Sequence, residues 1–216
     1  MKIGLIIPDR GDRPLFLKNC LRMMENQTVK PDIIELVDDA PMNYKCDITW
    51  RYRTGYERLR NKGVDVICLI ENDDWYSPFY LETMANEWEK NGKPDIFGTN
   101  YTIYYHIKLR AYFTMHHTTR ASAMNTFIVP NLDFKWCPDE EPYTDIHLWK
   151  IAKGLVIKPN KVISVGIKHG EGLCGGNMHK DRLHRYEQHG TKDNDFHYLK
   201  QIMDERSFKF YSEYFT

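Results

Sequence analysis

The sequence predicts an α/β fold with a mixed, mostly parallel central sheet that is flanked by helices. Three short apolar runs, at residues 3–7, 33–37 and 66–70, have the length and composition of buried strands. A segment with apolar residues at helical spacing, 14–24, separates the first two runs. This β-α-β order gives parallel strands in one sheet, with the loops that follow them at one edge.

Composition narrows the class of protein. The 216 residues contain no internal repeat, low-complexity tract or linker, which predicts a single domain. Lysine plus arginine and aspartate plus glutamate number 30 each, and this balance argues against a general nucleic-acid binder. No apolar run approaches the roughly 20 residues of a transmembrane segment, and no cleavage-site pattern follows the first strand. Five scattered cysteines without a CxxC pair predict no disulfide framework and a cytoplasmic protein.

Polar residues follow each of the first strands. The first strand is followed by the polar loop 9–13, and the second ends at Asp38 and Asp39, which also suit an ordinary turn. A basic helix is expected over 50–62, and Gly63 ends it. Most of its arginines suit a solvated face, although one of them could reach the ligand edge and pair with a phosphate.

The third apolar run, 66–70, stops abruptly at Glu71, Asn72, Asp73 and Asp74. In open α/β sheets the ligand lies beyond the carboxyl ends of the strands, so three carboxylates stand at the expected ligand edge. Their mutual repulsion is relieved by a divalent cation, and hard oxygen ligands suit Mg²⁺ or Mn²⁺. The alternative is a solvated acidic turn that caps the next helix.

The remaining elements follow in order. A helix is expected over 77–91, strands or a hairpin over 95–105 and 111–116, a strand over 126–129, a helix over 146–153, and strands over 155–157 and 162–167. The four glycines of residues 170–176 indicate a loop that could close over a ligand. Beyond residue 179 the chain is polar and helical, and Phe208, Tyr211 and Phe215 form an apolar face that suits docking onto the domain.

The order of these features resembles the family 2 glycosyltransferases with the GT-A fold. The similar features are Pro8 after the first strand, Asp38-Asp39 after the second, Glu71 to Asp74 after the third, and Thr144-Asp145 at the start of a late helix. The similarity covers roughly residues 2–169, and the whole chain also looks like the small glycosyltransferase domain encoded by large chlorella viruses. It implies a metal-dependent, inverting hexosyltransferase that uses Mn²⁺ or Mg²⁺.

The resemblance also implies partners and an internal division. The donor is a UDP-sugar, with UDP-glucose or a UDP-deoxyhexose as candidates, and the acceptor is a glycan or glycoprotein. The nucleotide-binding half spans about 1–97, the acceptor side about 98–178, and a helical C-terminal segment 179–216. The end of the chain at Thr216 has no capping signal, so a fragment of a longer protein is one interpretation.

Individual roles follow from the same resemblance. The residues implied in nucleotide-sugar binding are Pro8, Asp9, Arg10, Asp38, Arg53, Glu71, Asn72 and Asp73, with Asp38 on the uracil ring. Asp73 and His169 are the implied metal ligands, which Asp74 could join, and Asp145 is the implied catalytic base. Two positions depart from the family pattern, because Glu71 replaces an aspartate and Thr144 replaces an acidic residue.

Several alternatives stay open. The two departures are compatible with a sugar- or nucleotide-binding module that has lost turnover. A sugar nucleotidyltransferase is also considered, although its glycine-rich loop is not matched by residues 9–13, which hold one glycine. Asp145 would serve as a helix N-cap, and His169 would serve as a surface histidine. The residues that compete for the base role are Asp139, Glu140 and Glu141; a zinc site from His169, Cys174 and His179 matches no zinc spacing.

Overall fold

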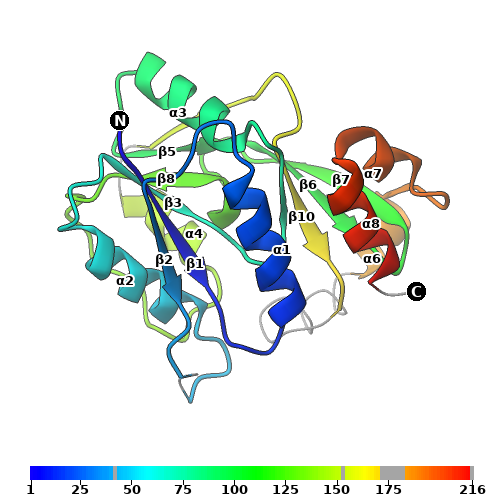
Figure 1. Ribbon diagram of the computed structural model, residues 1–216, viewed down its shortest axis with the longest axis horizontal. Coiled ribbons are helices and arrows are strands. Elements are labelled where there is room, and N and C mark those ends of the chain that lie inside the picture. Colours follow the sequence, from blue (N-terminus) through cyan, green and yellow to red (C-terminus); the bar gives the residue numbers. More distant parts are fainter. Residues whose placement is uncertain (41–42, 152–153, 171–182, 215–216) are drawn as a thin grey trace.

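The computed structural model describes residues 1–40, 43–151, 154–170 and 183–214 (Figure 1). The strands are β1 (Ile3–Pro8), β2 (Ile33–Val37), β3 (Val66–Leu69), β4 (Trp75–Tyr76), β5 (Ile96–Thr99), β6 (Tyr101–His106), β7 (Ala111–His116), β8 (Thr126–Ile128), β9 (Gly154–Ile157), β10 (Ser164–Lys168) and β11 (Thr191–Lys192). The helices are α1 (Pro14–Glu25), α2 (Ile48–Leu59), α3 (Tyr80–Lys90), α4 (Thr144–Ile151), α6 (Leu183–Gln188), α7 (His197–Ile202) and α8 (Glu205–Glu213), with a 3-10 turn at Ala123–Asn125.

The larger sheet has the strand order β2-β1-β3-β8-β5-β9. The β1–β2, β1–β3 and β5–β9 pairs are parallel, while β8 runs antiparallel to both of its neighbours. The prediction of a mixed, mostly parallel sheet is therefore confirmed. Both faces of the sheet are covered, because Leu5 and Ile7 of β1 belong to one apolar cluster and Ile6 belongs to another.

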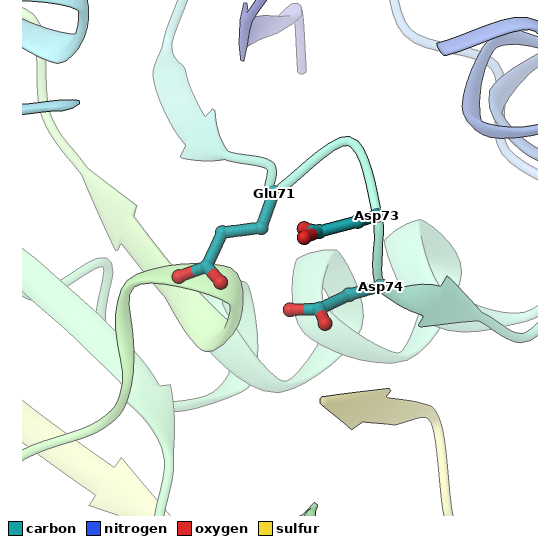
Figure 2. A group of neighbouring side chains, drawn as sticks. All are labelled: Glu71, Asp73 and Asp74. Atoms are coloured by element: carbon teal, nitrogen blue, oxygen red, sulfur yellow. The ribbon is translucent and has the colours of Figure 1, made fainter. Parts of the chain in front are cut away.

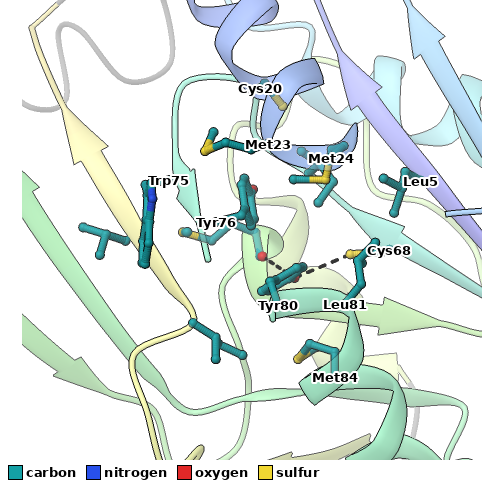
Figure 3. Close-up of a cluster of buried hydrophobic side chains, with 14 of the residues drawn as sticks. Leu5, Cys20, Met23, Met24, Cys68, Trp75, Tyr76, Tyr80, Leu81 and Met84 are labelled. Atoms are coloured by element: carbon teal, nitrogen blue, oxygen red, sulfur yellow. Dashed lines mark hydrogen bonds between the residues drawn. The ribbon is translucent and has the colours of Figure 1, made fainter. Parts of the chain in front are cut away.

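The two clusters contain different helices. Helices α1 and α3 contribute to the same cluster, α1 through Met23 and Met24 and α3 through Leu81 and Met84 (Figure 3). Helix α2 packs on the other face and contributes Tyr52 among other residues. The first strand is thereby fixed from both sides, and its carboxyl end is held in a defined position.

A second sheet, with the order β11-β7-β6-β10-β4, is absent from the sequence-based prediction. The segment expected as one strand over 95–105 divides at Asn100, and its halves, β5 and β6, enter different sheets. Strand β4 is only two residues long, and it lies between the acidic residues 71–74 and the helix expected to begin at residue 77. It pairs antiparallel with β10, and this pairing links the tip of β3 to the second sheet.

The C-terminal helices dock onto the domain, as their apolar face predicts. The Tyr211 hydroxyl donates to the Asp74 carbonyl oxygen at 2.9 Å, and the Phe208 side chain packs against the main cluster. Helix α8 also contacts α1, because the ring centroids of Phe210 and Phe16 lie 5.4 Å apart. Phe215, the third residue expected on this face, lies outside the described residues.

Two further predictions concern cysteines and membranes. Cys20, Cys68 and Cys137 are free thiols, as expected of a chain with no disulfide framework, but Cys46 is disulfide-bonded, which that expectation missed. Scattered single cysteines carry no spacing signal, which is why the sequence did not reveal the bond. Among the described helices, none combines the length and apolar character needed to cross a bilayer.

Candidate active site

A cavity of about 640 Å³ lies where the two sheets meet. Its wall combines residues from the larger sheet and its loops with residues from β6, β7, β10 and α6. The sequence-predicted site residues that line it are Pro8, Arg10, Glu71, Asn72, Asp73 and Asp145. The structure therefore gathers most of the predicted nucleotide-binding residues and the predicted base around one space.

The acidic cluster follows β3. Glu71, Asp73 and Asp74 each offer a carboxylate oxygen, and these three atoms lie within 4.8 Å of one another. Figure 2 shows the three side chains projecting from a single turn, with Asp73 and Asp74 aimed the same way. The turn is stabilised locally, because the Glu71 amide donates to the hydroxyl of Tyr76 at 2.8 Å.

Asp73 is the most strongly paired member of the cluster. Its Oδ2 forms an ion pair with the Nη1 of Arg13 and lies 2.9 Å from the Nε2 of His169. Burial alone would raise the pKa of Asp73, but Arg13 and His169 together hold that pKa well below the ordinary range. The adjacent Asn72 accepts from Arg13 at 3.2 Å and donates to Asp9 at 2.8 Å.

Asp74 lies deeper than Asp73 and is fully buried. One carboxylate oxygen accepts from the Ile167 amide at 2.7 Å, and no donor among the described residues reaches the other. Burial raises the pKa of Asp74 and of Glu71, an effect that the positive charge of Lys168 partly offsets. Lys168, which directly follows the strand expected over 162–167, therefore balances charge in this cluster, and no sequence motif indicates this role.

Asp145 lies in the first turn of α4, as expected for a residue at a helix start. Its carboxylate forms an ion pair with Arg120, another lining residue that sequence reasoning missed. Burial raises the pKa of Asp145, while Arg120 acts in the opposite direction. A carboxylate that lines a cavity and whose pKa is raised by burial is a candidate general base.

Two predicted binding residues lie elsewhere. Asp38 is exposed, just after the edge strand β2. Arg53 forms a bidentate ion pair with Asp139, with N–O distances of 2.9 and 2.7 Å. Neither Asp38 nor Arg53 is among the described residues that line the cavity. The cavity is instead lined by Asp47, whose carboxylate accepts from Arg10 at 2.9 Å and from Arg51. The Arg51 contact spans one turn at the start of α2, whereas the Arg10 contact joins two separate segments and is marked by no sequence motif.

Other expected features fall partly outside the described chain. Of the glycine-containing segment 170–176, residues 171–176 lie outside the described ranges, as do Cys174 and His179 of the zinc alternative. His169 itself is fully buried and stacks on Phe16, with ring centroids 4.7 Å apart, so the surface-histidine interpretation is wrong.

The donor atoms present fit a divalent cation. Asp73 Oδ2 and His169 Nε2 are 2.9 Å apart, close to the ~3.0 Å that separates neighbouring ligands around an octahedral ion with bonds of about 2.1 Å. Carboxylate oxygen suits Mg²⁺ and Mn²⁺, and imidazole nitrogen is a common ligand of transition metals. Asp74 belongs to the same cluster, and one of its carboxylate oxygens has no hydrogen-bond donor among the described residues.

Comparisons with known proteins find similar folds among solved structures. No family model and no curated protein matches the chain. Among solved structures, S. aureus TarS 1–349 in complex with UDP-GlcNAc superposes with a TM-score of 0.54 at 13% identity, over 81% of this chain and 60% of that chain. The same fragment in complex with UDP superposes with a TM-score of 0.51 at 12% identity, over 77% of this chain and 60% of that chain.

A third structure is a glycosyltransferase involved in the glycosylation of the major capsid of PBCV-1. It gives a TM-score of 0.43 at 7% identity, over 77% of this chain and 93% of that chain. The chain spans only about three fifths of the TarS fragment. The fold is of the GT-A type, as the sequence predicts, and the resemblance to glycosyltransferases is confirmed at the level of the fold.

Proposed function

We propose that the chain is a glycosyltransferase that moves a sugar from a UDP-sugar to a glycan acceptor, with inversion and with the help of Mn²⁺ or Mg²⁺. The observation that carries the proposal is that Glu71 and Asp73 of the acidic cluster line the same cavity as the partly buried Asp145. The complexes of TarS with UDP and UDP-GlcNAc support a nucleotide-sugar ligand for a cavity in this type of fold.

In this proposal one half of the cavity binds the nucleotide and the other half binds the acceptor. Pro8, Arg10 and Asn72 form the nucleotide side, within residues 1–97. Tyr104 and Phe113 supply an aromatic wall on the acceptor side, within residues 98–178. Aromatic faces of this kind suit the apolar face of a sugar ring.

The chemistry is a single displacement. The acceptor hydroxyl oxygen attacks the anomeric carbon, the bond from that carbon to the diphosphate oxygen breaks, and the proton passes to Asp145. A divalent ion held by Asp73 and His169 would neutralise the departing diphosphate. Lys168 adds positive charge beside the same cluster. Attack opposite the leaving group inverts the anomeric carbon.

A panel of nucleotide sugars tests this function. The purified chain is incubated with Mn²⁺ and, in turn, UDP-glucose, UDP-GlcNAc and a UDP-deoxyhexose, and UDP release is measured. We expect release above the protein-free rate with at least one donor, because water can replace the missing acceptor. The absence of release and of UDP binding with every donor would contradict the proposal.

The pH dependence of transfer follows from the surroundings of Asp145. Because its pKa is raised, the base form is lost at a higher pH than for an ordinary aspartate of pKa about 3.9. Replacing Arg120 with glutamine removes the charge that opposes this shift, so the acid limb of kcat/KM should move to higher pH. Arg185→Gln, which changes another lining cation, is the matched control. An acid limb that stays in place or moves to lower pH in Arg120→Gln would contradict this role.

A further inference from the structure

Arg13 makes a set of contacts that the proposed reaction does not explain. It stands just before α1, at the end of the loop 9–13. Its Nη1 forms the ion pair with Asp73 Oδ2 and lies 3.3 Å from His169 Nε2, while its Nη2 donates to Asn72 Oδ1 at 3.2 Å. One guanidinium thus joins the tip of β3 to the residue that follows β10.

These contacts use the atoms that fit a metal ion. Asp73 Oδ2 and His169 Nε2 are the two ligand atoms 2.9 Å apart, and the same Nη1 of Arg13 approaches both. A divalent cation bound to both atoms and the guanidinium in this position would place two cations in contact. Like charges at such a distance repel strongly where water is largely excluded, so the two states exclude each other.

The position of Arg13 is compatible with movement. Its Nε is buried without a hydrogen-bond acceptor, since the nearest carboxylate oxygen, from Asp12, is 3.7 Å away. The side chain lines the 640 Å³ cavity, which gives it room to turn. Two residues earlier, Gly11 has a φ of +77°, and a Cβ at that position would have no atom within 4 Å. The planar guanidinium is also well shaped to bind phosphate oxygens in pairs.

We propose that Arg13 is an internal cation that occupies the metal position on Asp73 and His169 in the unliganded chain. When the metal and the nucleotide arrive, Arg13 leaves these ligands and turns to the diphosphate in the cavity. This inference rests on the proposed UDP-sugar function and adds an order of events to it. Metal binding alone must displace Arg13 without compensation, whereas binding together with the diphosphate gives the guanidinium a new partner.

The consequence is a coupling between Mn²⁺ and UDP that depends on Arg13. In the unaltered chain, Mn²⁺ alone should bind weakly, and UDP should strengthen its binding. In Arg13→Ala the competing cation is gone, so Mn²⁺ alone should bind at least about tenfold more tightly, since one internal ion pair no longer has to break. The strengthening of Mn²⁺ binding by UDP should then decrease, because the diphosphate has lost its guanidinium partner.

Calorimetric titration of Mn²⁺, with and without UDP, tests this. Arg10→Ala is the matched control, because Arg10 lines the same cavity but pairs with Asp47 rather than with Asp73. Asp73→Ala should remove the Mn²⁺ signal in either background. Arg13→Gln provides a second variant, and thermal unfolding checks that each protein is folded.

The outcomes are separable. Tighter binding of Mn²⁺ in the absence of UDP in both Arg13 variants, with little change in that binding in Arg10→Ala, supports the inference. Equal or weaker Mn²⁺ binding in folded Arg13 variants overturns it, as does an absence of Mn²⁺ binding in all of the proteins. If UDP binds and UDP-sugars are cleaved while Mn²⁺ affinity does not respond to Arg13, only this inference fails. If UDP binds to none of the proteins, the proposed function fails.

Discussion

Replacing Asp145 with asparagine is expected to lower the rate of sugar transfer by about 10²–10⁴-fold, the usual contribution of a general base. The amide keeps the shape of the carboxylate and can still accept a hydrogen bond from Arg120, but it cannot take up the proton of the acceptor hydroxyl. UDP affinity should be unchanged, because Asp145 lies on the wall formed by α4 rather than at the tip of β3. Transfer rate and UDP affinity are measured on the same preparation.

Glu140→Gln is the control for this change, since Glu140 is a nearby carboxylate that is exposed and competes for the base role in the sequence alone. We expect it to keep full activity. Full activity in Asp145→Asn would reject the proposed base. An equal loss of UDP binding would assign Asp145 to the donor site and would leave a binding module as the better account.

Asp73→Asn should have the second largest effect, a loss of UDP affinity in the presence of Mn²⁺. Asp73 is the junction between Arg13 and His169, and the amide removes the negative charge that both contacts use. In the presence of Mn²⁺, UDP affinity should fall by at least the ~10–100-fold that follows loss of outer-shell support in metal sites. Calorimetric titration of UDP at fixed Mn²⁺ measures the change.

Asp12→Asn is the matched variant for Asp73. Asp12 lines the same cavity and lies 3.7 Å from the Nε of Arg13, but its side chain is 43% exposed and it is not part of the acidic cluster. Its UDP affinity should stay close to that of the unaltered chain. A similar loss in both variants would indicate a general charge effect on the cavity and would contradict a specific metal ligand at Asp73.

The sequence predicts the central part of this site because the signal there is local. A run of buried apolar residues followed at once by Glu71, Asn72, Asp73 and Asp74 identifies both a strand and the edge at which it ends. The helix start at Asp145 is local in the same way. The second sheet is not predictable by these means, because β4 has two residues and its partner β10 lies about 90 positions further along the chain.

The missed residues share a physical reason. Arg13, Arg120 and Lys168 act through partners that are distant in sequence, and isolated basic residues have no periodic signature. Asp38 shows that a local signal can also mislead. It follows a correctly predicted strand, but β2 is the outermost strand of its sheet, and Asp38 is exposed there. Which residue after a strand faces the cavity depends on the loop path, and that path is set by tertiary contacts.

The most direct test of the account is a titration of UDP into the unaltered chain, first with Mn²⁺ and then with EDTA. UDP should bind with Mn²⁺, and its binding should weaken when the metal is removed, because the carboxylates at the tip of β3 would then face the diphosphate without a divalent cation. The absence of UDP binding under both conditions would contradict it. The acidic tip would then be a turn that closes onto Arg13 and Lys168, and the similarity to TarS would describe the fold alone.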